Sequence, residues 1–245
     1  MKSPTGYVFY KGPSMLDGAP IVGVALTGRS ANSKTGNLVQ TYVLADNGLS
    51  ALESARSGAD RSVCGNCPHR RYHASGIAGK TGACYVNLGQ GPRAVSDGVR
   101  RGIYPTFDST ARERLRGRLI RLGSYGDPAA IPFSVWADLL KGTDGHTGYT
   151  HQWRDPRFSR FGMLCMASVD NEAEAHTAWL AGWRTFRVKS AESIKLSGEV
   201  VCPASAEAGH KVTCSQCLAC DGAGAKRSVV INAHGVLKGR FEGGV

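Results

Sequence analysis

The chain has 245 residues, 42% of them hydrophobic, which is enough to bury a large α/β core without disulfide bonds. Its 30 Lys and Arg residues against 19 Asp and Glu residues give a net charge of +11, a balance that favours polyanionic or phosphate-bearing partners. No run reaches the roughly 18 apolar residues of a membrane-spanning helix, and residues 1–12 lack the apolar core of a signal peptide. We therefore expect a cytoplasmic protein without a membrane segment.

The first 117 residues predict strands followed by helices. Two β-rich apolar runs flank a loop of hairpin composition, which predicts a small N-terminal hairpin or sheet. Glycine-rich residues 48–60 have loop composition, and residues 60–63 would add a further strand. Two helices are then expected, the second with Asp108 or Ser109 as its N-cap. In chain order the expected strands are 20–26 and 37–45, and the expected helices are 91–102 and 108–117.

From residue 118 short apolar strands alternate with helices, a pattern typical of βα units around a parallel sheet. The second helix has Asp170 as its expected cap and Gly182 at its end. We predict an N-terminal β-rich extension at 1–60 and an incomplete (β/α) barrel at 61–245 that carries a Cys-rich C-terminal loop. The expected strands are 118–128, 148–153, 163–170, 184–189, 199–205 and 228–235, and the expected helices are 131–142 and 171–182.

Polar side chains follow these strands, and βα folds place their sites at the carboxyl ends of the strands. Asp127 and His151 are the catalytic candidates among them. For His151 a hydrogen-bonded structural role is the alternative, and for Asp127 the alternative is ordinary turn chemistry before proline. The strand-end residues are Cys64, Cys67, Ser124, Asp127, His151, Gln152, Ser168, Asp170, Cys202 and His234.

Eight cysteines in a reducing compartment indicate metal or cluster ligation over a disulfide framework. The C-terminal group, C-x2-C-x2-C preceded by a strand-end cysteine, suits four-thiolate zinc or a [4Fe-4S] cluster, with the cluster favoured. Four unligated thiols are the alternative, but free thiols rarely crowd in this way. This group consists of Cys202, Cys214, Cys217 and Cys220.

The first cysteine group is Cys64, Cys67 and Cys84. Zinc would need a fourth ligand there, for which His69 and His73 are the candidates. A [4Fe-4S] cluster held by three thiolates would instead leave one iron open to substrate or cofactor. The eighth cysteine, Cys165, lies in an apolar strand and is expected to be a core residue.

These features resemble the radical S-adenosylmethionine enzymes, which are partial βα barrels with three cysteines in a loop. The resemblance implies that Cys64, Cys67 and Cys84 hold a [4Fe-4S] cluster whose open iron binds S-adenosylmethionine, with Tyr85 beside it. It also implies that "GSYGDP", which contains Ser124, Gly126 and Asp127, receives the cofactor's amino group. The C-terminal cysteines would resemble an auxiliary cluster. This chain has C-x2-C and a sixteen-residue gap where that family has C-x3-C-x2-C.

Strings such as "CGNCPHR", "CYVNLGQGP" and "RLGSYGDPAAIP" more closely resemble a family of cysteine-rich proteins carried by bacteriophages and plasmids. The resemblance runs over nearly the whole chain. It implies a mobile-element origin and a bacterial host cell, without a particular activity.

Seven arginines crowd into residues 100–121, which predicts a face for nucleic acid or a nucleotide, with a solvated helix face as the alternative. The leading hypothesis is therefore an iron-sulfur protein, radical-SAM-like, that acts on a nucleotide or nucleic acid. Its rivals are a zinc-stabilised basic protein that binds nucleic acid without catalysis, and a barrel with a structural or redox-sensing cluster. Whether the protein is an enzyme stays open at this point.

Overall fold

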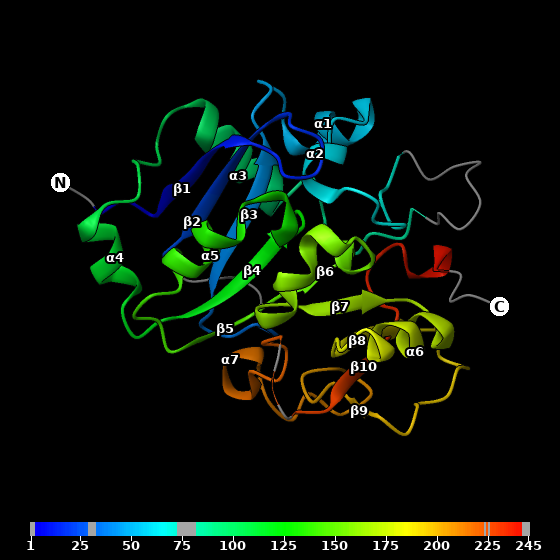
Figure 1. Cartoon of the computed structure of the whole chain (residues 1–245). Coiled ribbons are helices and arrows are strands. Elements are labelled where there is room, and N and C mark those ends of the chain that lie inside the picture. Colours follow the sequence, from blue (N-terminus) through cyan, green and yellow to red (C-terminus); the bar gives the residue numbers. More distant parts are fainter. Residues whose placement is uncertain (1–2, 29–32, 73–81, 223, 225, 242–245) are drawn as a thin grey trace. The chain divides into compact units, whose positions relative to one another are not determined.

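A computed structural model of the chain describes residues 3–28, 33–72, 82–222, 224 and 226–241. The α/β class is confirmed, and the described strands form two five-stranded sheets (Figure 1). The chain divides into two compact units whose segments interleave. Unit 1 comprises residues 1–30, 37–66 and 86–146, and unit 2 comprises residues 31–36, 67–85 and 147–245. The predicted division at residue 60 stays a prediction about domains.

Unit 1 contains the first sheet, in the order β1-β2-β3-β4-β5. β1, β2 and β3 pair antiparallel, as the hairpin composition predicts, and β3 pairs parallel with β4. Its strands are β1 (Gly6–Pro13), β2 (Pro20–Leu26), β3 (Val39–Ala45), β4 (Leu119–Tyr125) and β5 (Gly145–Thr147). Its helices are α1 (Ala51–Ser57), α2 (Arg61–Cys64), α3 (Gly91–Arg100), α4 (Ser109–Leu115), η1 (Pro128–Ala130) and α5 (Phe133–Leu139).

Unit 2 contains the second sheet, in the order β6-β7-β8-β10-β9, and every pair in it is parallel. Its strands are β6 (Tyr149–Thr150), β7 (Met166–Val169), β8 (Thr185–Lys189), β9 (Glu199–Val201) and β10 (Ser228–Asn232). Its helices are η2 (Gln152–Arg154), η3 (Pro156–Met163), α6 (Glu172–Leu180), α7 (Cys214–Cys217) and η4 (Lys238–Arg240). A barrel of successive βα units would place β9 between β8 and β10. Here β10 lies between β8 and β9, so the incomplete barrel stays a prediction.

Each sheet has its own buried core. In unit 1 the fully buried side chains include Ile21, Leu44, Ile120 and Trp136. In unit 2 all four residues of β7 are buried, as expected for a central strand of a parallel sheet. Cys165, immediately before β7, is 1% exposed, which confirms it as a core residue.

Three local expectations are wrong. Residues 60–63 belong to the helical turn of α2 rather than to a strand, because the amide of Cys64 bonds to the carbonyl of Asp60. Residues 51–57 form α1 rather than a loop, since Ser50 and Glu53 make a capping box. Asn171, one residue after the expected Asp170, caps α6 by accepting the Glu174 amide.

No helix among the described residues is long and apolar enough to cross a membrane.

A buried ion pair stabilises the second sheet. Both guanidinium contacts from Arg187 on β8 to the carboxylate of Glu199 on β9 are 2.7 Å long, and the two side chains are 3% and 0% exposed. Glu199 also accepts the backbone N–H of Leu196 at 2.9 Å. Removing one partner would leave the other charge buried and uncompensated.

We therefore expect Arg187→Ala to lower the free energy of unfolding by about 3–5 kcal/mol, measured by urea denaturation. The control is Arg157→Ala, which removes an exposed pair with Asp155 and should leave the midpoint unchanged. Equal midpoints for the two variants would contradict a structural role for the buried pair.

Candidate metal centre

His151 is positioned by the end of β6. It is the first residue after this strand and precedes η2. The hydroxyl of Thr150 accepts the Gln152 amide at 3.0 Å, and Nε1 of Trp153 donates to the carbonyl of Ser168 at 3.0 Å. These bonds connect η2 to β7 and position the backbone of His151.

Asp170 follows β7, the neighbouring strand. Because β6 and β7 are parallel, with Thr150 opposite Ala167, their carboxyl ends meet at one edge of the sheet. Asp170 is buried, and its backbone N–H donates to the carboxylate of Glu174 at 3.0 Å. The start of α6 thus holds the Asp170 backbone.

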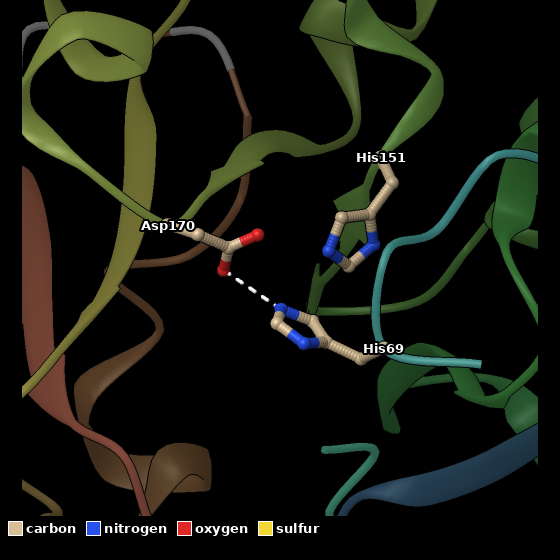
Figure 2. A group of neighbouring side chains, drawn as sticks. All are labelled: His69, His151 and Asp170. Carbon is tan, nitrogen blue, oxygen red and sulfur yellow. Dashed lines mark ion pairs between the residues drawn. The ribbon is translucent and has the colours of Figure 1, made fainter. Parts of the chain in front are cut away.

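His69 completes the group from a loop. Its carbonyl accepts the amide of Cys84 at 3.0 Å, which fixes the loop segment locally. Its Nε2 lies 2.9 Å from Oδ1 of Asp170, and its ring centroid lies 5.8 Å from that of His151 (Figure 2). All three residues belong to unit 2.

His69 and Asp170 are in direct contact, with Nε2 of the imidazole 2.9 Å from Oδ1 of the carboxylate, and both atoms are buried. Both are atoms that bind metal ions, and a cation between them would replace this contact.

The charges around the group favour cation binding. Burial lowers the pKa of His151 from 6.5 to about 4, so the ring is neutral and keeps a lone pair at physiological pH. Burial alone would raise the pKa of Asp170, but His69, His151 and Arg154 bring it below its usual value, so the carboxylate is ionised. The imidazole of His151 and the carboxylate of Asp170 are thus both in the form that binds a metal ion.

The spacing of these atoms suits a metal ion. One ligand atom from each residue lies within 4.8 Å of the other two. Two ligands of a tetrahedral zinc ion with bonds of about 2.0–2.1 Å are about 3.3 Å apart. Small side-chain movements would therefore close the group around an ion. Two histidines with one carboxylate are a ligand set of catalytic zinc and of non-haem iron sites.

Cys67 lies beside this group. Its Sγ is 3.9 Å from Nε2 of His151, but it is not one of the three atoms that converge. Of the first cysteine group, Cys67 and Cys84 belong to unit 2, and Cys64 ends α2 in unit 1. His73 lies outside the described residues. The predicted cluster at these thiols stays a prediction.

Other predicted site residues have structural contacts within unit 1. Ser124 donates to Oε1 of Gln40 at 2.7 Å. Gly126 has φ +79°, and a Cβ there would lie 2.6 Å from the carbonyl oxygen of Val43. Asp127 is buried and caps η1 by accepting the Ala129 amide at 2.9 Å. Their predicted cofactor and catalytic roles stay predictions.

Tyr85 belongs to unit 2 and is 49% exposed, with its ring 5.3 Å from that of His234. The arginines of residues 100–121 make local contacts in unit 1. Arg100 pairs with Asp97, Arg112 with Asp138, and Arg116 with Glu113. These pairs fit the solvated helix face that was the alternative to a nucleic-acid surface, and the nucleic-acid partner stays a prediction.

Sequence reasoning named His151 and Asp170 at the strand ends but did not group them with His69. The signal was present, since parallel strands bring successive strand ends together, but His69 was considered only beside cysteines. No family of known proteins, curated protein or solved structure matches this chain.

The depressed pKa of His151 has a consequence for the metal-free protein. Below pH 6.5 His151 is protonated in the unfolded chain but stays neutral in the folded chain. The free energy of unfolding therefore decreases as the pH is lowered from about 6.5 to 4. The loss attributable to this ring is at most about 3–4 kcal/mol. Denaturation at several pH values, with metal removed, should show it. His151→Asn should flatten this part of the profile, and a profile parallel to that of the wild type would contradict the assignment.

Proposed function

We propose that unit 2 is a metal-dependent hydrolytic module in which His69, His151 and Asp170 bind one divalent ion, with zinc as the first candidate. The observation that supports this is the convergence of two imidazoles and one carboxylate at the carboxyl ends of two adjacent parallel strands. Three protein ligands leave a fourth position for water, the arrangement of catalytic rather than structural zinc.

The chemistry follows from that open position. A zinc ion held by His69, His151 and Asp170 would lower the pKa of water at the open position and so would supply a nucleophile near neutral pH. The net charge of +11 favours an anionic substrate, and a phosphate ester such as a nucleotide or nucleic acid is the class we propose. Arg154, whose charge acts on both His151 and Asp170, lies near enough to add to the local positive potential.

Metal binding tests the first part of this proposal. The wild type and the double variant His69→Ala/His151→Ala are dialysed against zinc and desalted, and their zinc content is measured by plasma mass spectrometry. The wild type should retain one more zinc ion per chain than the double variant. The control is His176→Ala, an exposed histidine on α6, which should retain the wild-type amount. Equal zinc in wild type and double variant would overturn the site.

A substitution of Cys67 tests whether the fourth coordination position of the metal ion is open. If it is open, the Cys67 thiol is not a ligand, and Cys67→Ser should retain the metal. If this variant loses the ion, the site is a closed, structural one, and the hydrolytic proposal fails.

Hydrolysis is tested on bis(p-nitrophenyl) phosphate, a chromogenic phosphodiester. The zinc-loaded wild type should release nitrophenolate, and Asp170→Asn should lower the rate on the order of 100-fold, because the metal-bound nucleophile is lost. A rate that survives chelation or the Asp170 change would contradict metal-dependent hydrolysis.

The radical-SAM-like iron-sulfur function is a second proposal. What supports it is the bond from the Cys84 amide to the His69 carbonyl, which holds the segments of Cys67 and Cys84 side by side in unit 2. In protein purified without oxygen, iron with acid-labile sulfide that disappears in Cys84→Ala would favour it. Formation of 5′-deoxyadenosine from S-adenosylmethionine would then test the chemistry.

A further inference from the structure

The four C-terminal cysteines gather beside the second sheet. Cys202 follows β9, Cys214 and Cys217 begin and end α7, and Cys220 lies three residues further on. Cys202 and Cys220 are buried in one apolar cluster with residues of β7 and β10, and Cys214 packs against that cluster. Cys217 belongs to the same four-residue helix as Cys214. All four therefore occupy one neighbourhood within unit 2.

One side chain, Arg184, holds the loop that follows Cys217. Its guanidinium donates to the carbonyls of Ala219, Gly222, Lys226 and Arg227 at 2.6–2.9 Å. It also pairs with Asp221 at 2.9 Å. The carbonyl of Cys220 accepts the amide of Gly148 at 2.8 Å, which ties the loop to the start of β6. The described residues of this loop are thus held by contacts with Arg184 and with the start of β6.

The other side of α7 is equally constrained. The Lys34 carbonyl accepts the amide of Cys214 at 2.9 Å. Gly36 has φ +62°, and a Cβ there would lie 2.3 Å from the hydroxyl of Ser215, so this segment approaches α7 as only glycine allows. Leu218, between Cys217 and Cys220, has φ +45°, a strained conformation for a branched side chain. This positive φ lies between two of the four cysteines.

The four thiols differ in exposure. Cys202 and Cys220 are 7% and 8% exposed, whereas Cys214 and Cys217 are partly exposed. All four cysteines are free of disulfides.

We propose that Cys202, Cys214, Cys217 and Cys220 bind a second metal centre through four thiolates, either one zinc ion or one [4Fe-4S] cluster, with a structural role. Both centres take four thiolate ligands, and the C-x2-C-x2-C spacing suits either. A set of four protein ligands leaves no open position, which distinguishes this centre from the one at His69, His151 and Asp170.

The experiment uses the full chain in the His69→Ala/His151→Ala background, so the two proposals fail separately. Protein purified without oxygen is analysed for zinc, iron and acid-labile sulfide. Either one zinc or four irons with four sulfides per chain is expected, and Cys214→Ser/Cys217→Ser should lose that content. Cys165→Ala, which removes a buried thiol outside the set, should keep it. If the background protein and its two cysteine variants all contain the same amount of metal, well below one zinc or four irons per chain, the proposal of a second centre is wrong.

A measurement without substitutions covers the case in which the cysteine variant does not fold. Cys214 and Cys217 are partly exposed, so iodoacetamide can reach them in metal-free protein. Alkylation mapped by mass spectrometry should fall at least tenfold at both residues in the metal-loaded protein relative to the chelated protein. Equal alkylation in the two states would overturn the proposal, whatever happens at the His69 site.

Discussion

The parallel pairing of β6 with β7 is the constraint on which the candidate site depends. Side chains that follow two adjacent parallel strands leave the sheet at the same edge, and here those residues are His151 and Asp170. A shift of one residue in this register would turn each side chain of β7 to the opposite face of the sheet and would move Asp170 relative to His151. All four residues of β7 are buried, so both faces of the strand are packed and such a shift would require the core to repack. The packing of one short strand thereby positions two polar groups.

The sequence was sufficient for much of the fold. Residues 20–26 match β2 residue for residue, and the alternation of strands and helices after residue 118 indicated parallel pairing. The helix of residues 51–57 was missed although its capping box can be read as Ser50 and Glu53, because the abundance of glycine on both sides was given more weight. The division of the strands between two sheets could not be predicted, since each strand pattern specifies a buried face but not its partner.

The candidate site was predictable only in part. His151 and Asp170 follow directly from the strand ends. His69 could not be added, because a loop residue 82 positions before His151 is placed by tertiary contacts such as the bond from the Cys84 amide. For the C-terminal cysteines the spacing was the signal, and the Arg184 contacts that organise their loop were invisible, since they join residues that are about 40 positions apart.

Both proposed centres lie in unit 2, whose chain segments are far apart in sequence. During synthesis from the N-terminus, Cys67 is made 84 residues before His151. At about 5–20 residues per second, this interval lasts roughly 4–17 s. For that time the ribosome presents a cysteine- and histidine-bearing loop whose parallel-strand partners do not yet exist. The nascent chain thus presents a set of soft ligand atoms that differs from the set in the folded unit, and for the two proposed centres the order of translation would bear on which ion is bound first.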